Sequence, residues 1–243
     1  MKYFGYFFGG VLSLVLILVV IFWAGAQLSL DRTFAHSRAT AELPFFNSNS
    51  NDGLVRIITE RGGFRARVAG FGRQEERPLV VLLHGFPVTS AMWLDLIPAL
   101  VEAGYRVVAF DQRGYSPQMR PKEVNQYVVP QMVSDVFAVA DVVGEENFHL
   151  VGHDWGAGVG WGVVLAKPSR IISWTPLSIA HPAAFGAALQ NDPDQQSRSS
   201  YFALFTTPGI PETLFTFNDF WFLKGVFGNM RAEKIDEYID VFS

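Results

Sequence analysis

The sequence contains no cysteine among its 243 residues, and this absence removes several classes of chemistry. Without cysteine there is no disulfide framework, no thiol nucleophile and no thiolate ligand for a metal. No group of histidine and acidic residues has the spacing of metal ligands, so we expect neither a metal nor another cofactor. Because the formal net charge is -4 and no basic cluster is interleaved with aromatic residues, nucleic acid is not an expected partner.

Charged residues are also missing from the amino-terminal segment, since Tyr3 to Leu30 carries none and Tyr3 to Ala26 is almost wholly apolar. As a helix, the apolar run would span roughly 36 Å, enough to cross a bilayer. Ala24-Gly25-Ala26 has the small-x-small pattern of a signal cleavage site, but the run is longer than the apolar region of most signals. We expect residues 1–28 to form an uncleaved membrane anchor. A cleaved signal, leaving a secreted or periplasmic protein, is the alternative.

Polar residues follow this segment, and residues 29–53 are predicted to be a linker that ends in the low-complexity spacer Asn47 to Asp52. A helical pattern capped by Thr89 or Ser90 stops at Gly104. Further helical patterns alternate with short apolar runs that predict strands. This alternation predicts an α/β fold over residues 54–180, with a mostly parallel sheet, helices on both faces and a ligand site at the carboxyl ends of the strands. The predicted parallel strands are Leu79–Leu83, Tyr105–Phe110, Phe148–Val151 and Ile171–Leu177.

The strand at Phe148–Val151 leads into Gly152-His153-Asp154-Trp155-Gly156. This run follows the Gly-x-nucleophile-x-Gly elbow, whose central residue lies on a sharp turn between a strand and a helix. Glycines flank that residue because the turn leaves no room for Cβ atoms. A carboxylate at this point favours attack on saturated carbon, which gives an alkyl ester, over the acyl transfer that a serine performs. The predicted nucleophile is therefore Asp154, and epoxides and alkyl halides are the candidate substrates.

Three further motifs follow predicted strands: His84 to Pro87, Asp111 to Ser116 and Ser178 to Pro182. Together with the elbow, they resemble the α/β-hydrolase fold, and specifically its epoxide hydrolase and haloalkane dehalogenase branch. The resemblance extends from about Leu54 to the end of the chain. Four motifs in the family's order make it specific.

The resemblance implies roles for the residues around Asp154. The backbone N–H groups of Phe86 and Trp155 would form an oxyanion hole for the ester intermediate. His84, with Gly85 and Pro87, would support the loop that carries Phe86 and would not react.

The resemblance also implies a helical cap, which would begin within residues 181–243. This region is rich in aromatic residues, as a lid over a small apolar substrate would be. Epoxide hydrolases place in the cap a tyrosine that donates a proton to the epoxide oxygen, and Tyr201 matches its position ahead of Pro208-Gly209. Haloalkane dehalogenases commonly have an asparagine where Phe86 stands. The leading hypothesis is a membrane-anchored enzyme resembling epoxide hydrolases, and the alternatives are a haloalkane dehalogenase-like hydrolase or a binding protein without turnover.

Hydrolysis of the alkyl ester needs a histidine, held by an acid, that activates water. In the family this histidine follows the cap, whereas the only histidine after Asp154 is His181, at the start of the predicted cap. We therefore expect this chain to be truncated within the cap, and to lack the catalytic histidine and the relay acid. The strand Ile171–Leu177 would then be an exposed apolar edge. Such a chain would be alkylated once at Asp154 and then stall.

Overall fold

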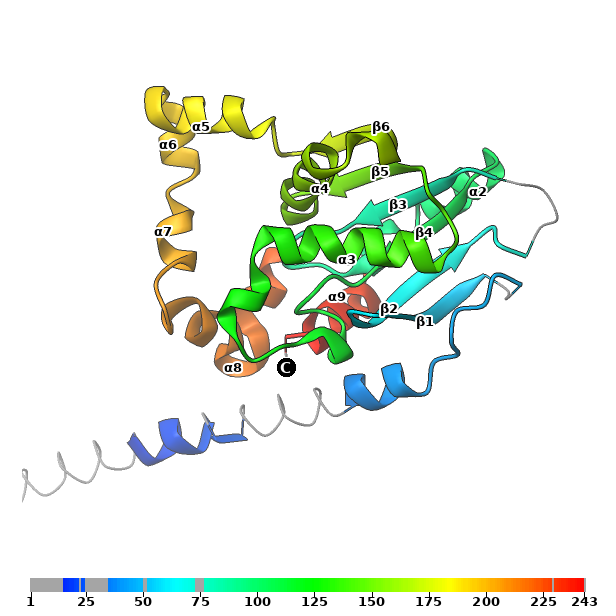
Figure 1. Cartoon of the computed structure of the whole chain (residues 1–243). Coiled ribbons are helices and arrows are strands. Elements are labelled where there is room, and N and C mark those ends of the chain that lie inside the picture. Colours follow the sequence, from blue (N-terminus) through cyan, green and yellow to red (C-terminus); the bar gives the residue numbers. More distant parts are fainter. Residues whose placement is uncertain are drawn as a thin grey trace, which may run out of the picture. The chain divides into compact units, whose positions relative to one another are not determined.

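The structure is a computed structural model that describes residues 15–21, 23–24, 35–49, 52–72, 77–228 and 230–242 (Figure 1). It divides into two compact units. The larger unit is Ser37–Ser200, and the smaller unit comprises Met1–His36 and Tyr201–Ser243. The predicted domain limits at residues 28, 53 and 180 stay predictions.

A single sheet forms the centre of the larger unit, with its described strands in the order β1-β2-β4-β3-β5-β6 (Figure 1). The β1–β2 hairpin is antiparallel, and β2 also runs antiparallel to β4. In contrast, β4, β3, β5 and β6 are parallel to one another. The prediction of a mostly parallel sheet is confirmed. The strands are β1 (Gly53–Thr59), β2 (Gly62–Ala69), β3 (Leu79–Leu83), β4 (Arg106–Phe110), β5 (Phe148–His153) and β6 (Ile171–Leu177).

Helices cover both faces of this sheet, as predicted. Val136 on α3 and Val159 on α4 are buried in the cluster on one face, whereas Trp93 on η1 and Ile97 on α2 are buried in the cluster on the other. The α-helices here are α2 (Ile97–Glu102), α3 (Val129–Val142) and α4 (Trp155–Ala166). The 3₁₀ helices are η1 (Ser90–Trp93), η2 (Pro117–Met119), η3 (Val124–Tyr127) and η4 (Pro168–Arg170).

The single helix predicted up to Gly104 is instead split between η1 and α2. Thr89 caps η1, because its side chain accepts a hydrogen bond from the backbone N–H of Ala91. Pro98 lies in the first turn of α2, where its missing N–H costs nothing, whereas farther inside a continuous helix it would remove a hydrogen bond. The chain therefore makes two short helices.

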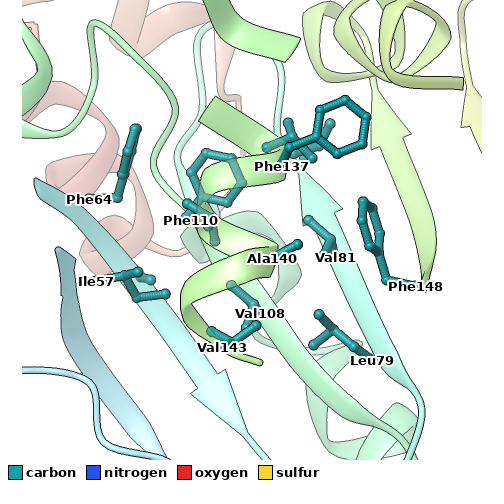
Figure 2. Packing of buried hydrophobic residues seen from close by; sticks show 14 of the residues in the cluster. Ile57, Phe64, Leu79, Val81, Val108, Phe110, Phe137, Ala140, Val143 and Phe148 are labelled. Carbon is teal, nitrogen blue, oxygen red and sulfur yellow. The ribbon is translucent and has the colours of Figure 1, made fainter. Parts of the chain in front are cut away.

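The main core lies between the sheet and the helices α3 and α4, which cover one of its faces (Figure 2). Side chains alternate along each strand, so Phe64 on β2 enters this core while Arg67 on the same strand contacts Ser90 of η1 on the other side. Each large apolar side chain buried here contributes about 1.5–3 kcal/mol. The residues labelled in Figure 2 are Ile57, Phe64, Leu79, Val81, Val108, Phe110, Phe137, Ala140, Val143 and Phe148.

One edge of the sheet is formed by β6, which pairs with β5 alone among the described strands. Ile172 and Leu177 on this strand are 52% and 41% exposed. This matches the exposed apolar edge predicted from the sequence.

Beyond β6 the described chain is mostly helical. The larger unit ends with α5 (Pro182–Asn191) and α6 (Pro193–Arg198), and the smaller unit contains α7 (Tyr201–Phe205), α8 (Ile210–Val226) and α9 (Ala232–Asp240). Residues 217–220 of α8 have non-helical dihedral angles and form a kink. In the smaller unit the ring of Phe227 lies 5.3 Å from that of Tyr238 on α9.

The predicted anchor at residues 1–28 lies largely outside the described residues. Of this segment, residues 15–21 and 23–24 are described, and they are helical. Within the described parts of the chain, no helix has the length and apolar character needed to cross a bilayer.

Candidate active site

The predicted elbow is present at the carboxyl end of β5. This strand ends at His153 and α4 begins at Trp155, so Asp154 alone makes the turn between them. Its dihedral angles are φ 53° and ψ -122°, a region that a residue with a Cβ rarely occupies. Such strain persists only where the surrounding structure holds it, and it is found preferentially at functional sites. The turn presents the Asp154 carboxylate as a nucleophile elbow would.

Glycines make this turn possible through close packing. A Cβ atom at Gly152 would lie 2.5 Å from the carbonyl oxygen of Gly156, and one at Gly156 would overlap the carbonyl oxygen of Leu83 on β3. At Gly85 a Cβ atom would overlap Asp154, lying 2.6 Å from its Oδ1. The loop after β3 therefore lies directly against the candidate nucleophile, which explains why that loop carries a glycine.

Of the two predicted oxyanion donors, Phe86 contacts the Asp154 carboxylate directly, and Trp155 follows Asp154 in the chain. The backbone N–H of Phe86 donates a hydrogen bond to Asp154 Oδ1 at 3.0 Å. Trp155 is the first residue of α4, so its N–H has no acceptor within the helix. The partial positive charge of the helix terminus favours negative charge at this point. The structure thus brings Phe86 to Asp154, while Trp155 is 60% exposed at the start of α4.

His84 is fully buried beneath the loop. Its Nδ1 lies 3.0 Å from the carbonyl oxygen of Gly85, and its Nε2 lies 3.0 Å from the backbone nitrogen of Gln112. Burial lowers the pKa of His84, which keeps the ring neutral. This arrangement agrees with a supporting role for His84, Gly85 and Pro87.

The loop of residues 111–116 lies beside the loop that carries His84. Asp111 accepts hydrogen bonds from Arg65 Nη1 at 2.8 Å and from the backbone N–H of Ser90 at 2.9 Å. Burial alone would raise the pKa of Asp111, but the positive charge of Arg65 and other nearby groups outweighs it and holds the pKa well below its ordinary value. Asp111 therefore stays ionised and fastens this loop to β2 and η1.

Tyr115 lies beside His84, although the sequence predicted no role for it. Its ring lies 4.5 Å from the ring of His84 in an edge-to-face arrangement. Burial is the main cause that raises the pKa of Tyr115, and the negative charge of Asp154 raises it further. The Tyr115 hydroxyl therefore stays protonated. The motif Asp111 to Ser116 was a signal for this loop, but the contact of Tyr115 with His84 depends on the tertiary structure.

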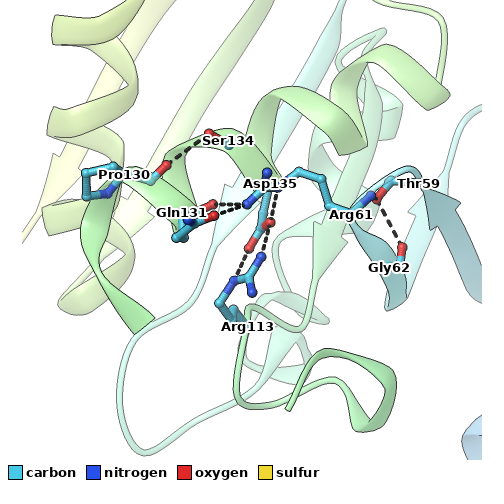
Figure 3. A network of polar contacts seen from close by, with 8 residues as sticks. All are labelled: Thr59, Arg61, Gly62, Arg113, Pro130, Gln131, Ser134 and Asp135. Carbon is cyan, nitrogen blue, oxygen red and sulfur yellow. Dashed lines mark hydrogen bonds and ion pairs between the residues drawn. The ribbon is translucent and has the colours of Figure 1, made fainter. Parts of the chain in front are cut away.

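A buried ion network fastens the same loop to α3 (Figure 3). Asp135 on α3 accepts two hydrogen bonds from Arg113, at 2.8 Å from Nε and 2.7 Å from Nη2. Asp135 also accepts one from Arg61 Nε at 2.6 Å, and Arg61 bonds Gln131 as well. Two parallel hydrogen bonds from one guanidinium to one carboxylate strengthen the ion pair and fix its orientation. The loop carrying Tyr115 is therefore held from two sides.

Two further residues that the sequence suggested, His181 and Tyr201, follow β6 in the chain. Tyr201 belongs to the smaller unit, where its half-exposed ring contacts Phe202 and Phe205 at 4.7 and 5.4 Å, and its catalytic role stays a prediction. His181 caps α5, with Nδ1 accepting the N–H of Ala183 at 3.2 Å. Among the described residues, no group of histidine and acidic side chains is arranged to hold a metal.

A cavity of about 700 Å³ lies beside α2, and neither Asp154 nor Phe86, His84 or Trp155 lines it. Its location therefore does not define the candidate active site. Its lining consists of Asp52, Gly53, Leu54, Arg67, Val68, Ala69, Leu94, Ile97, Pro98, Val101 and Glu102.

Comparison with known proteins identifies relatives that are similar in sequence. The chain is 36% identical over 169 residues to AB hydrolase superfamily protein YfhM of Bacillus subtilis, covering 70% of this chain and 59% of that protein. It is 32% identical over 200 residues to mouse Epoxide hydrolase 4, covering 78% and 55%. With Epoxide hydrolase B of Mycobacterium tuberculosis it shares 39% identity over 149 residues, covering 61% and 42%. The chain thus spans about half the length of these curated relatives.

Solved structures agree with this relationship. The epoxide hydrolase VrEH1 from Vigna radiata superposes with a TM-score of 0.64 and 27% identity, covering 80% of this chain and 68% of that structure. Epoxide Hydrolase A from Mycobacterium thermoresistibile gives a TM-score of 0.63 and 28% identity, covering 79% and 70%. The family model described as the alpha/beta hydrolase fold matches residues 78–207, which is more than half of the chain. The chain therefore belongs to the alpha/beta hydrolase fold family, and within that family it resembles the epoxide hydrolases.

Proposed function

We propose that this chain carries the nucleophile of an epoxide hydrolase-like enzyme and that Asp154 attacks a carbon of a small apolar epoxide. The observation that carries the proposal is the strained position of Asp154 with Oδ1 bound to the N–H of Phe86 at 3.0 Å. A serine at this position would indicate an esterase, but a carboxylate favours attack on saturated carbon. The names of the relatives support an epoxide as the substrate.

The hydrogen bond from Phe86 assigns different roles to the two carboxylate oxygens. Oδ2 would form the new bond to carbon as the carbon–oxygen bond of the epoxide breaks, and the epoxide oxygen would take a proton from an acid. Tyr201 is the proposed acid, from its position in the cap-like sequence. Oδ1 would become the carbonyl oxygen of the ester, already bound to the N–H of Phe86, and the N–H of Trp155 is the second proposed donor.

Hydrolysis of this ester would place negative charge on Oδ1 when water adds to the ester carbon. Preorganised N–H donors stabilise such a charge, and removing one donor slows a reaction of this type by about 10²–10³. A general base must also activate the water. His181 is occupied in capping α5, so we assign it no catalytic role.

The experiment that tests the proposal is labelling of the chain with an apolar epoxide such as styrene oxide, followed by intact-mass and peptide-mass measurement. We expect one epoxide mass added to Asp154 and no addition to Asp154→Asn. Asp194→Asn is the matched control, because Asp194 is an exposed acid on α6 and should leave labelling unchanged. An adduct of equal yield in Asp154→Asn would contradict the proposal. Labelling by a chloroalkane but not by the epoxide would favour the haloalkane dehalogenase-like alternative.

We further propose that residues 1–28 attach the chain to a membrane. The support is the uncharged segment from Tyr3 to Leu30. Extraction of membranes with alkaline carbonate tests this, because an anchored chain should stay in the pellet and a chain with a cleaved signal should be released. Amino-terminal sequencing would identify cleavage after Ala26.

A further inference from the structure

The N–H of Phe86 belongs to the same peptide group as the carbonyl of Gly85. Because a trans peptide is planar, its C=O and N–H point in opposite directions, and whatever holds one also orients the other. The Gly85 carbonyl oxygen accepts the N–H of Val88 at 3.2 Å and lies 3.0 Å from Nδ1 of His84. On its other side, the same peptide directs the Phe86 N–H to Asp154 Oδ1. The orientation of the oxyanion donor therefore depends on His84 together with the N–H of Val88.

His84 can hold the Gly85 carbonyl only if Nδ1 carries the proton. A neutral imidazole has one donor nitrogen and one acceptor nitrogen. The backbone N–H of Gln112 lies 3.0 Å from Nε2, so Nε2 is the acceptor and Nδ1 is left as the donor. The backbone N–H of Gln112, in the neighbouring loop, thus fixes the tautomer of His84.

Gln112 makes a second contact with the same residue. Its side-chain amide donates to the backbone carbonyl oxygen of His84, and the Gln112 side chain is buried, with 6% of the residue exposed. One residue therefore holds both the ring and the main chain of His84. Asp111, which precedes it, is fastened to Arg65 and Ser90, so the position of Gln112 is itself well supported.

We infer that Gln112 is a positioning residue for the oxyanion donor: by holding His84 it selects the Nδ1–H tautomer and orients the Gly85–Phe86 peptide toward Asp154. The inference deepens the proposed function and rests on it for its kinetic consequence. Gln112 acts through His84 and Phe86, and it does not touch the reacting atoms.

The kinetic test uses Gln112→Met, which keeps the length of the side chain and the backbone N–H that bonds His84 Nε2, and removes only the side-chain amide that holds the His84 carbonyl. Ester formation puts no charge on Oδ1, whereas ester hydrolysis does, so the two steps should respond differently. We expect the alkyl-Asp154 ester to decay about tenfold more slowly and to form within about twofold of the original rate. The adduct is isolated by desalting and its decay followed by mass at alkaline pH, where hydroxide is the nucleophile. Gln118→Met, an exposed position on η2, is the matched control and should change neither rate.

A second readout does not depend on activity. The amide proton of Phe86 is hydrogen-bonded to a carboxylate, so its resonance should lie far downfield and it should exchange slowly with solvent. In Gln112→Met this resonance should move upfield and the exchange should be faster. In the unsubstituted protein, the ¹⁵N shifts of His84 should show a protonated Nδ1 and an unprotonated Nε2.

The outcomes separate the two proposals. Absence of any adduct on Asp154 would refute the proposed function, while the Phe86 and His84 signals would still decide the role of Gln112. An unchanged Phe86 amide in Gln112→Met, equal slowing of ester formation and decay, or the opposite His84 tautomer would overturn the inference. The tautomer measurement needs no variant, so it applies even if Gln112→Met does not fold.

Discussion

Removal of the Asp135 carboxylate should be one of the most destabilising changes to this chain. Asp135 has 2% of its side chain exposed and accepts three hydrogen bonds, two from Arg113 and one from Arg61 (Figure 3). Substitution by alanine leaves both arginines charged and removes their shared partner.

The two arginines should respond differently, because Arg113 has 6% of its side chain exposed and Arg61 has 23%. Arg61 can turn toward water and keeps its contacts with Gln131, so its loss of Asp135 should contribute about 1 kcal/mol or less. Arg113 would become a buried charge without this partner, and breaking a buried pair in this way costs about 3–5 kcal/mol. We therefore expect Asp135→Ala to lower the free energy of unfolding by about 3–5 kcal/mol, mainly through Arg113.

Urea denaturation followed by circular dichroism measures this change. Asp194→Ala is the control, since it breaks an exposed pair with Arg198 and should change stability by about 0.5 kcal/mol or less. Replacing both buried partners, in Arg113→Met with Asp135→Leu, should recover most of the loss, because no charge is then left buried. A loss below about 1 kcal/mol in Asp135→Ala, or a double variant as unstable as the sum of its singles, would refute the reasoning.

Two further predictions concern the site. Gly85→Ala should slow labelling of Asp154 by about tenfold or more, since its Cβ atom would overlap Asp154, whereas Gly158→Ala on α4 meets nothing within 4 Å and should be neutral or stabilise by up to about 1 kcal/mol. Labelling rates and urea denaturation test this, and equal effects at both positions would contradict it. Burial lowers the pKa of His84 in the folded state, so the unfolded state binds the proton first as the pH falls. Stability should therefore be full above about pH 6.5 and decline below it, and His84→Asn should show a smaller decline in urea denaturation than the unsubstituted chain. Identical pH dependence would argue against a buried neutral His84.

Local sequence patterns were sufficient for much of the fold. Continuous apolar runs such as Leu79–Leu83 predict buried parallel strands, and this strand is fully buried. The elbow at Asp154 was equally predictable, because the flanking Gly152 and Gly156 indicate a turn with no room for Cβ atoms. The prediction of a single helix up to Gly104 was wrong, because Pro98 is accommodated only in the first turn of a separate helix.

The contacts between distant segments were decided by the tertiary structure alone. Arg61 and Asp135 are 74 positions apart in the sequence, yet they pair because α3 packs against β1, and the turn that joins β1 to β2 carries Arg61. The distance from Phe86 to Asp154 depends on the parallel register of β3 and β5.

Composition and spacing predicted an acid at a sharp strand-to-helix turn, beside a glycine-containing loop, and the structure has this local geometry. They did not determine which atoms hold that loop, because Gln112 and His84 meet only through the side-by-side packing of β3 and β4. A local motif is set by the dihedral angles of a few adjacent residues, whereas such a contact requires the register of several strands to be correct at once.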